Sequence, residues 1–130
     1  AGLEIPQDWL LNGKMTLVGG RAATREILAK KERPTAILCA NDEMALGALH
    51  EIKQAGLRVP EDMSIVGFDN IRYSEISDPP LTTIEQPAED IGMRVTKRLF
   101  AVIDGEHIEE KVEIVPHSLV VRGSSAPPKV

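Results

Sequence analysis

Two short stretches of this chain end in polar side chains that could bind a ligand. Residues 35–42 read Thr-Ala-Ile-Leu-Cys-Ala-Asn-Asp, and residues 64–70 read Ser-Ile-Val-Gly-Phe-Asp-Asn. We interpret each as a buried parallel strand with polar groups at its carboxyl end, the place where open α/β sheets bind ligands. Carboxylates and amides gathered there suit the hydroxyls of a sugar-like molecule, and they also suit a metal ion. The predicted rim consists of Asn41, Asp42, Asp69 and Asn70.

Alternating strand and helix patterns surround these stretches and predict an α/β fold, with an open, mostly parallel sheet flanked by helices. Helices are expected over residues 19–31, 43–55 and 87–103, the second capped by Asn41 or Asp42. Residues 1–123 are expected to form one domain, and residues 124–130 a linker or frayed tail. The expected strands cover residues 9–12, 35–40, 63–68, 81–85, 111–115 and 118–122.

Composition excludes several classes of protein. The 130 residues suffice for one domain, and 42% of them are apolar, enough for a core. Aromatic residues make up 3%, too few for a base-stacking surface, and the net charge of −5 is a poor match for DNA or an anionic membrane. No apolar stretch has the length of a membrane span. The sequence lacks an initiator Met and a signal peptide, so we expect a fragment of a longer protein.

The common catalytic and cofactor motifs are not found. There is no P-loop, no Gly-x-Gly-x-x-Gly and no Gly-x-Ser-x-Gly, and the three histidines His50, His107 and His117 are scattered. The single cysteine, Cys39, falls inside an apolar strand and is expected to be a buried hydrophobe. The sequence therefore predicts no catalysis, no cofactor and no metal. A remote alternative is an enzyme that holds Mg²⁺ between Asp42 and Asp69.

Several longer stretches resemble the effector domain of LacI/GalR-type bacterial transcriptional repressors. The resemblance covers nearly the whole chain, in matching order and spacing. It implies one subdomain of a periplasmic-binding-protein-like (Rossmann-like) fold, in which two α/β subdomains enclose a ligand. It also implies that the DNA-binding headpiece and most of the first subdomain lie outside this chain. The matching stretches are Cys-Ala-Asn-Asp-Glu-Met-Ala-Leu-Gly-Ala-Leu (39–49), residues 56–70, Asp-Pro-Pro-Leu-Thr-Thr-Ile-Glu-Gln-Pro (78–87) and residues 119–124.

The resemblance also implies which side chains meet the effector. Asp69 matches the family position that accepts hydrogen bonds from effector hydroxyls, and Asn41 matches a second contact position. Met15 falls where relatives often place a stacking aromatic, and Lys14 departs from the Asp common there, so the effector's identity stays open. Asp42 could instead be a helix cap or an orienting group. The expected effector-binding set is Asp69, Asn41, Gln86, Met15, Asn70 and Asp42.

Finally, the resemblance implies a homodimer. Leu46 lies off the apolar stripe of the helix over residues 43–55, at a position that the family uses for dimerisation. The expected function is effector sensing and dimerisation in a cytoplasmic bacterial repressor, with a sugar or nucleoside-like effector and operator DNA bound only through the missing headpiece. A periplasmic sugar-binding receptor of the same fold is the alternative. The expected interface comprises Leu46, His50, Tyr73, Ile76 and Leu81.

Overall fold

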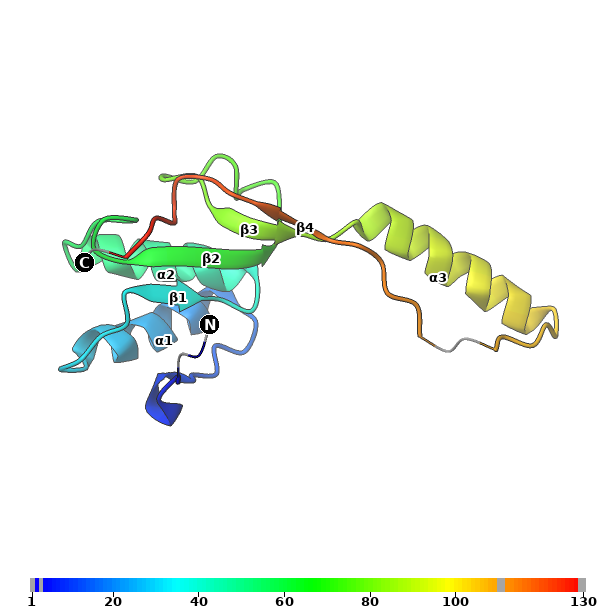
Figure 1. Ribbon diagram of the computed structural model, residues 1–130, viewed down its shortest axis with the longest axis horizontal. Helices are drawn as coiled ribbons and strands as arrows, with labels where there is room; N and C mark the ends of the chain where they lie inside the picture. The colour runs from blue at the N-terminus through cyan, green and yellow to red at the C-terminus, as the bar shows by residue number, and fades with distance from the viewer. Residues whose placement is uncertain (1, 3, 110–111, 129–130) are drawn as a thin grey trace.

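The protein consists of an α/β body and a projecting arm (Figure 1). This computed structural model describes residue 2, residues 4–109 and residues 112–128. The sheet has four strands in the order β1-β2-β3-β4, namely β1 (Ala36–Leu38), β2 (Ser64–Asp69), β3 (Thr82–Glu85) and β4 (Ser118–Val120). The first three strands run parallel and β4 runs antiparallel to β3. The predicted open, mostly parallel sheet is therefore confirmed.

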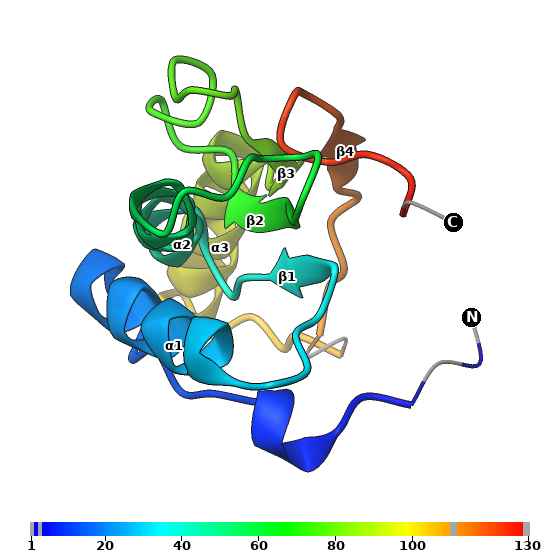
Figure 2. The ribbon, with the colours of Figure 1, turned by 90° about the vertical axis from the view of Figure 1, so that its left-hand side faces the viewer.

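Two helices cover one face of this sheet (Figure 2). Helix α1 (Leu17–Ala29) begins at Thr16, whose side chain accepts a hydrogen bond from the backbone N–H of Gly19, and α2 (Asp42–Gln54) is capped in the same way by Asn41. Glycines let the two helices pack closely, since a Cβ at Gly20 would lie 2.4 Å from the backbone oxygen of Met44. Both helices match the expected ones within two residues.

The core lies between α2 and the sheet. Ala45, Ala48 and Ile52 project from α2 onto Ile65 of β2, and all four are at most 1% exposed. The segment after β4 closes this core. Ser124 is fully buried, its Oγ donates to the backbone oxygen of Ile65 at 2.7 Å, and it accepts from the backbone N–H of Thr82 at 2.8 Å. The expectation of a linker or frayed end from residue 124 onward is therefore wrong for Ser124.

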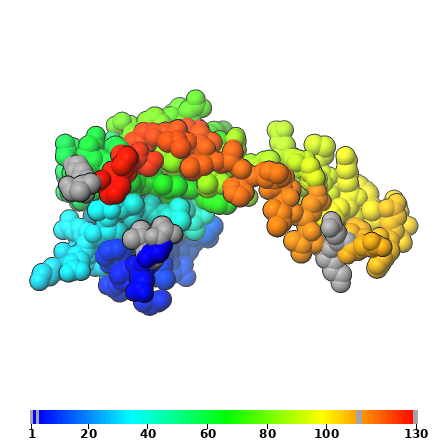
Figure 3. Space-filling model, viewed as in Figure 1, coloured from blue at the N-terminus to red at the C-terminus, as the bar shows by residue number. Residues whose placement is uncertain are grey.

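The arm consists of α3 (Ala88–Ile103) and the chain that returns from it to β4. Helix α3 has no buried residue, although Val95, Leu99 and Phe100 are apolar and each is more than half exposed. Figure 3 shows that the arm stands clear of the body, and Figure 1 shows that it is connected to the body at the ends of β3 and β4. The expected helix over residues 87–103 is present, but the described part of the chain places only residues 112–115 beside it and buries none of its side chains.

Two expected strands are not found. Residues 7–9 form a short 3₁₀ helix, η1 (Gln7–Trp9), in which the backbone N–H of Trp9 donates to the oxygen of Pro6 at 2.9 Å, so the strand over 9–12 is wrong. Residues 112–115 run beside α3 without pairing to any described strand, while residue 111 lies outside the described residues. A strand needs a neighbour to satisfy its backbone groups, and neither segment has one in the described chain.

Candidate ligand-binding site

The carboxyl ends of β2 and β3 bring the predicted polar residues together at one edge of the sheet. Asp69 ends β2 and is paired in register with Glu85, which ends β3. Asn70 and Gln86 follow directly, and both are half-buried. We use the name polar rim for Asp69, Asn70, Glu85 and Gln86.

Asp69 occupies an unusual backbone conformation. Its φ is 114° and that of Asn70 is 56°, so two consecutive residues with side chains lie in the region that glycine normally occupies. Such strain persists only where the surroundings enforce it, and it is concentrated at functional sites. The Asp69 Oδ1 accepts a hydrogen bond from Gln86 Nε2 at 2.5 Å. No donor to Asp69 Oδ2 is found among the described residues, so this oxygen is available to an incoming hydroxyl or amine.

The side chain of Asn70 connects Glu85 and Arg122 by hydrogen bonds. Its Nδ2 donates to Glu85 Oε1 at 3.2 Å, and its Oδ1 accepts from Arg122 Nη2 at 2.9 Å. Arg122 also donates through Nη1 to the backbone oxygen of Leu81 at 2.8 Å. Our sequence reasoning missed Arg122 and Glu85, because nothing local in the sequence reveals the antiparallel pairing of β3 with β4 that brings them to Asn70.

Asn41 links the rim side of α2 to the loop before α1. Its Oδ1 caps α2 by accepting the backbone N–H of Met44 at 2.9 Å, and its Nδ2 donates to the backbone oxygen of Met15 at 3.1 Å. Met15 and Lys14 have φ values of 55° and 52°, so this loop is a second left-handed turn. The side chain of Met15 is 56% exposed. Asn41 thus fixes the backbone of the loop that carries Met15, and one N–H of its amide remains for a ligand.

Asp42 differs from the other candidates because it is fully buried. Its Oδ1 accepts from Thr83 Oγ1 at 2.6 Å, and its Oδ2 accepts from Ser74 Oγ at 2.6 Å and from the backbone N–H of Ile71 at 2.9 Å. With both oxygens engaged by the protein, Asp42 has no surface to offer a ligand or a cation. The Mg²⁺ site between Asp42 and Asp69, which the sequence left as a remote alternative, would therefore lose one of its two ligands.

Other chemistry at this end of the molecule is limited. Burial foremost, and then the negative charge of Asp42, raise the pKa of the Cys39 thiol to about 12, so Cys39 is no nucleophile at neutral pH. Among the described residues, no group of three or more His, Cys, Asp or Glu side chains is arranged to hold a metal ion. None of the helices in the described ranges combines the length and the hydropathy of a membrane span.

The residues expected at a dimer interface divide into two groups. Tyr73 and Ile76 are 49% and 76% exposed, His50 is exposed and Leu46 is half-buried, so all four reach the surface. Leu81 is fully buried and belongs to the core, so its assignment to an interface is wrong. Leu81 follows the loop that contains Tyr73 and Ile76, and its side chain packs over Gly67 of β2.

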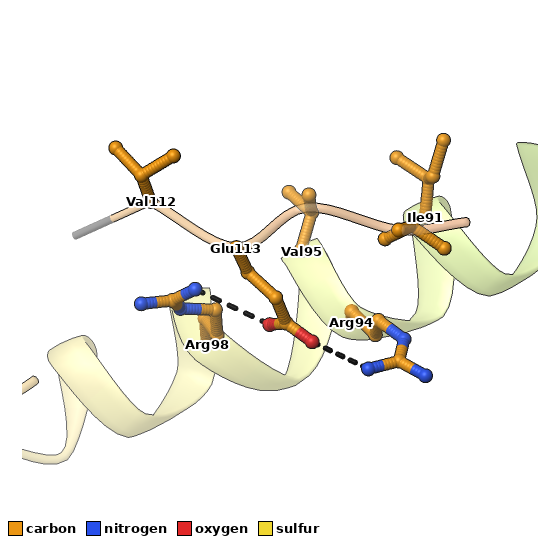
Figure 4. A pocket seen from close by; sticks show the side chains of 7 residues that line it. Ile91, Arg94, Val95, Arg98, Val112 and Glu113 are labelled. Carbon is orange, nitrogen blue, oxygen red and sulfur yellow. Dashed lines mark hydrogen bonds and ion pairs between the residues drawn. The ribbon is translucent and has the colours of Figure 1, made fainter. Parts of the chain in front are cut away.

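A hollow lies on the arm, away from the polar rim. Figure 4 shows it between α3 and residues 112–115, with Ile91, Val95 and Val112 around it. Glu113 accepts hydrogen bonds from both Arg94 and Arg98, and Asp90 accepts one from Arg94 at 2.9 Å, so two carboxylates offset the two guanidinium groups. The hollow is apolar with a closed ion-pair network, and it shares no residue with the polar rim.

Comparison with known proteins places this geometry in a family. Residues 1–125 match the periplasmic binding protein-like domain. The repressor CytR of Escherichia coli is 40% identical over 124 residues, which are 95% of this chain and 36% of CytR. The chain thus spans little more than a third of that relative.

Two solved structures show the same fold. The complex of the regulator CelR with cellobiose has a TM-score of 0.90 at 35% identity and covers 95% of this chain and 38% of CelR. The lac repressor dimer bound to operator and the anti-inducer ONPF has a TM-score of 0.79 at 38% identity, over 85% of this chain and 38% of its own. The chain belongs to the periplasmic binding protein-like domain family and corresponds to the C-terminal part of the effector-binding domain of LacI-type transcriptional regulators.

Proposed function

We propose that this chain is the effector-sensing and dimerising part of a LacI-type repressor whose ligand is a sugar or a nucleoside-like molecule. The observation that carries the proposal is the Asp69 carboxylate. It stands at the carboxyl end of a central strand on a left-handed turn, with one oxygen fixed by Gln86 and the other without a donor among the described residues. A fixed carboxylate oxygen is a strong acceptor for ligand hydroxyls.

The remaining rim residues receive distinct roles. Gln86 orients the carboxylate and presents its amide oxygen to the ligand, while Met15 forms an apolar wall that is held by Asn41. Asn70 keeps the turn in place through Glu85 and Arg122. The related CelR is described in complex with cellobiose, which fits a site that recognises hydroxyl groups.

Dimerisation is assigned to the surface formed by Leu46, His50, Tyr73 and Ile76. The guanidinium of Arg72 lies 4.8 Å from the ring centre of Tyr73 and donates to its hydroxyl at 2.7 Å, so Tyr73 is held in one orientation on this surface. The related lac repressor is described as a dimer on its operator. A two-fold interface built from these residues would be self-complementary.

We assign operator binding and the closure of the ligand site to the rest of the parent protein. We place that protein in the cytoplasm of a bacterium. The net charge of −5 is unfavourable for DNA. No residue of α3 is buried, and the chain covers about a third of its relatives' length. We therefore propose that the first subdomain packs against α3 in the parent protein. Effector bound between the subdomains would then favour one arrangement of the DNA-binding headpieces.

The test uses the full-length polypeptide beside this chain. A thermal-shift screen of sugars, nucleosides and purines identifies the ligand, which at about a hundred times its dissociation constant adds roughly 2.7 kcal/mol of stability. DNA retardation follows with and without that ligand. We expect the full-length polypeptide to retard DNA in a salt-sensitive and ligand-dependent way, and this chain alone not to retard it.

A full-length polypeptide that binds a sugar but never DNA would favour the periplasmic receptor of the same fold. Retardation of DNA by this chain alone would contradict the proposal that DNA binding requires the rest of the parent protein.

A further inference from the structure

Asp42 is a buried carboxylate without a cation to neutralise it in the described part of the chain. Its three hydrogen-bond partners are the Oγ1 of Thr83, the Oγ of Ser74 and the backbone N–H of Ile71, at 2.6, 2.6 and 2.9 Å. Ser74 and Thr83 are themselves fully buried. A buried charge is unfavourable unless donors surround it, so this arrangement needs a reason beyond capping α2, which Asn41 already does.

All three donors belong to segments that meet the polar rim. The N–H of Ile71 follows the two left-handed residues Asp69 and Asn70 directly. Thr83 lies on β3 and also accepts the backbone N–H of Asn70 at 3.4 Å. Ser74 lies in the loop that leaves the rim. Asp42 therefore restrains the chain at the point where it exits the strained turn.

The strand that enters the turn is tied to the same carboxylate. A Cβ at position 67 would lie 2.1 Å from the Oδ1 of Asp42, so the carboxylate lies against β2 only because residue 67 is glycine. Gly67 precedes Asp69 by two residues on the same strand. One carboxylate thus contacts both the strand before the turn and the loop after it.

We propose that Asp42 is a positioning residue of the ligand site, which holds the Asp69–Asn70 turn in its left-handed conformation and thereby aims the Asp69 carboxylate. The part of this proposal that concerns the ligand rests on the function proposed above. Without the Asp42 charge the turn relaxes toward ordinary backbone angles, because the hydrogen bonds that Asp42 accepts from Ile71, Ser74 and Thr83 then no longer offset the strain at two residues that carry a Cβ. Asp42 itself touches no ligand.

The test compares two acid-to-amide changes on the same helix of the full-length polypeptide. Asp42→Asn removes the charge that faces the turn and places an amide N–H₂ against existing donors. Glu51→Gln is the matched control, because Glu51 is also a buried carboxylate of α2 but faces Arg21 and Arg25 of α1. The first measurement is hydrogen exchange at the backbone amides of Asn70 and Ile71.

We expect Asp42→Asn to speed the exchange of these two amides about ten- to a hundred-fold, the equivalent of one lost hydrogen bond to a charged group. Glu51→Gln should leave them at the parent rate relative to the rest of the body. Equal rates in Asp42→Asn and the parent, or equal acceleration by Glu51→Gln, would overturn the proposal. If Asp42→Asn does not fold, Thr83→Val removes the bridge between Asp42 and Asn70 and should give the same effect in smaller degree.

The second measurement is a double-mutant cycle on ligand response, with cellobiose, ribose and the four common ribonucleosides as probes. Asp42→Asn should weaken the response of the parent but change nothing further in the Asp69→Ala background, since it acts through Asp69. Additive losses would overturn the positioning role. Faster exchange at Asn70 and Ile71 with no response of the parent to any probe would leave Asp42's hold on the turn standing and contradict the proposed ligand class instead.

Discussion

One helix of the body and one helix of the arm share an amphipathic pattern but differ in burial. Helix α2 buries Ala45, Ala48 and Ile52 against the sheet, whereas α3, three residues longer, buries none. Both are amphipathic, although only α2 has a side-chain cap, which Asn41 provides. The difference lies in what the rest of the described chain offers each helix, since α2 has β2 beside it and α3 has only residues 112–115. Amphipathic pattern thus specifies a helix, but its burial depends on a partner.

The largest effect that separates the two regions should come from removing one apolar side chain from each. Ile52 is fully buried, so Ile52→Ala should lower the free energy of unfolding of this chain by about 2–5 kcal/mol. Leu99 on α3 is 57% exposed, and Leu99→Ala should change the same free energy by less than about 0.5 kcal/mol. Urea denaturation followed by circular dichroism checks both.

In the full-length polypeptide the first subdomain should cover α3, and Leu99→Ala should then lower the free energy of unfolding markedly. Equal effects of the two substitutions in the isolated chain would show that the arm is packed after all.

The second-largest expected effect concerns the dimer surface of the body. Leu46→Asp would place two charges at a two-fold interface and should weaken the dimer at least about a hundred-fold, with little effect on folding because Leu46 lies off the core stripe. Sedimentation velocity on the parent chain and the variant measures this. Leu99→Asp, on the arm, is the control and should leave the dimer intact. A parent chain that is monomeric at high concentration would refute the proposed interface.

The smallest effect is a pH dependence within the body. Hydrogen bonds from Arg25 first, and then from Arg21, lower the pKa of Glu51 to about 2. Because this pKa is below that of the unfolded chain, Glu51 stabilises the fold above about pH 4.5 and loses that contribution as the pH falls toward 2. The stability difference between the parent chain and Glu51→Gln should therefore shrink over this range. A difference that is the same at neutral pH and at pH 2 would contradict the ion-pair origin.

The sequence predicted the body better than the arm, for physical reasons. Apolar runs and caps such as Asn41 are local signals, and they placed α1, α2 and the parallel strands within a few residues. The same kind of signal suggested strands at residues 9–12 and 111–115. Strand formation depends on a distant partner, however, and the described chain supplies none to either segment.

The polar rim shows a similar limit. That Asp69 and Asn70 would lie at a strand end followed from pattern alone, and the structure brings them together with Gln86. The roles of Asp42, Ser74 and Thr83 did not follow, because their hydrogen bonds connect residues about 30 to 40 positions apart. Leu81 was assigned to an interface as one of the apolar residues of the irregular segment 73–81, although it enters the core at that point.

Calorimetric titration of the full-length polypeptide and its Asp69→Ala variant, with the ligand found by the thermal-shift screen, measures whether the Asp69 carboxylate binds the effector. Glu61→Ala is the control, because Glu61 lies in the exposed loop before β2, at the opposite end of the strand from Asp69. Each lost hydrogen bond to the carboxylate should weaken binding about ten- to a hundred-fold, with the fold intact by circular dichroism. An unchanged dissociation constant in Asp69→Ala, equal to that of Glu61→Ala and the parent, would contradict the assignment of the polar rim as the effector site.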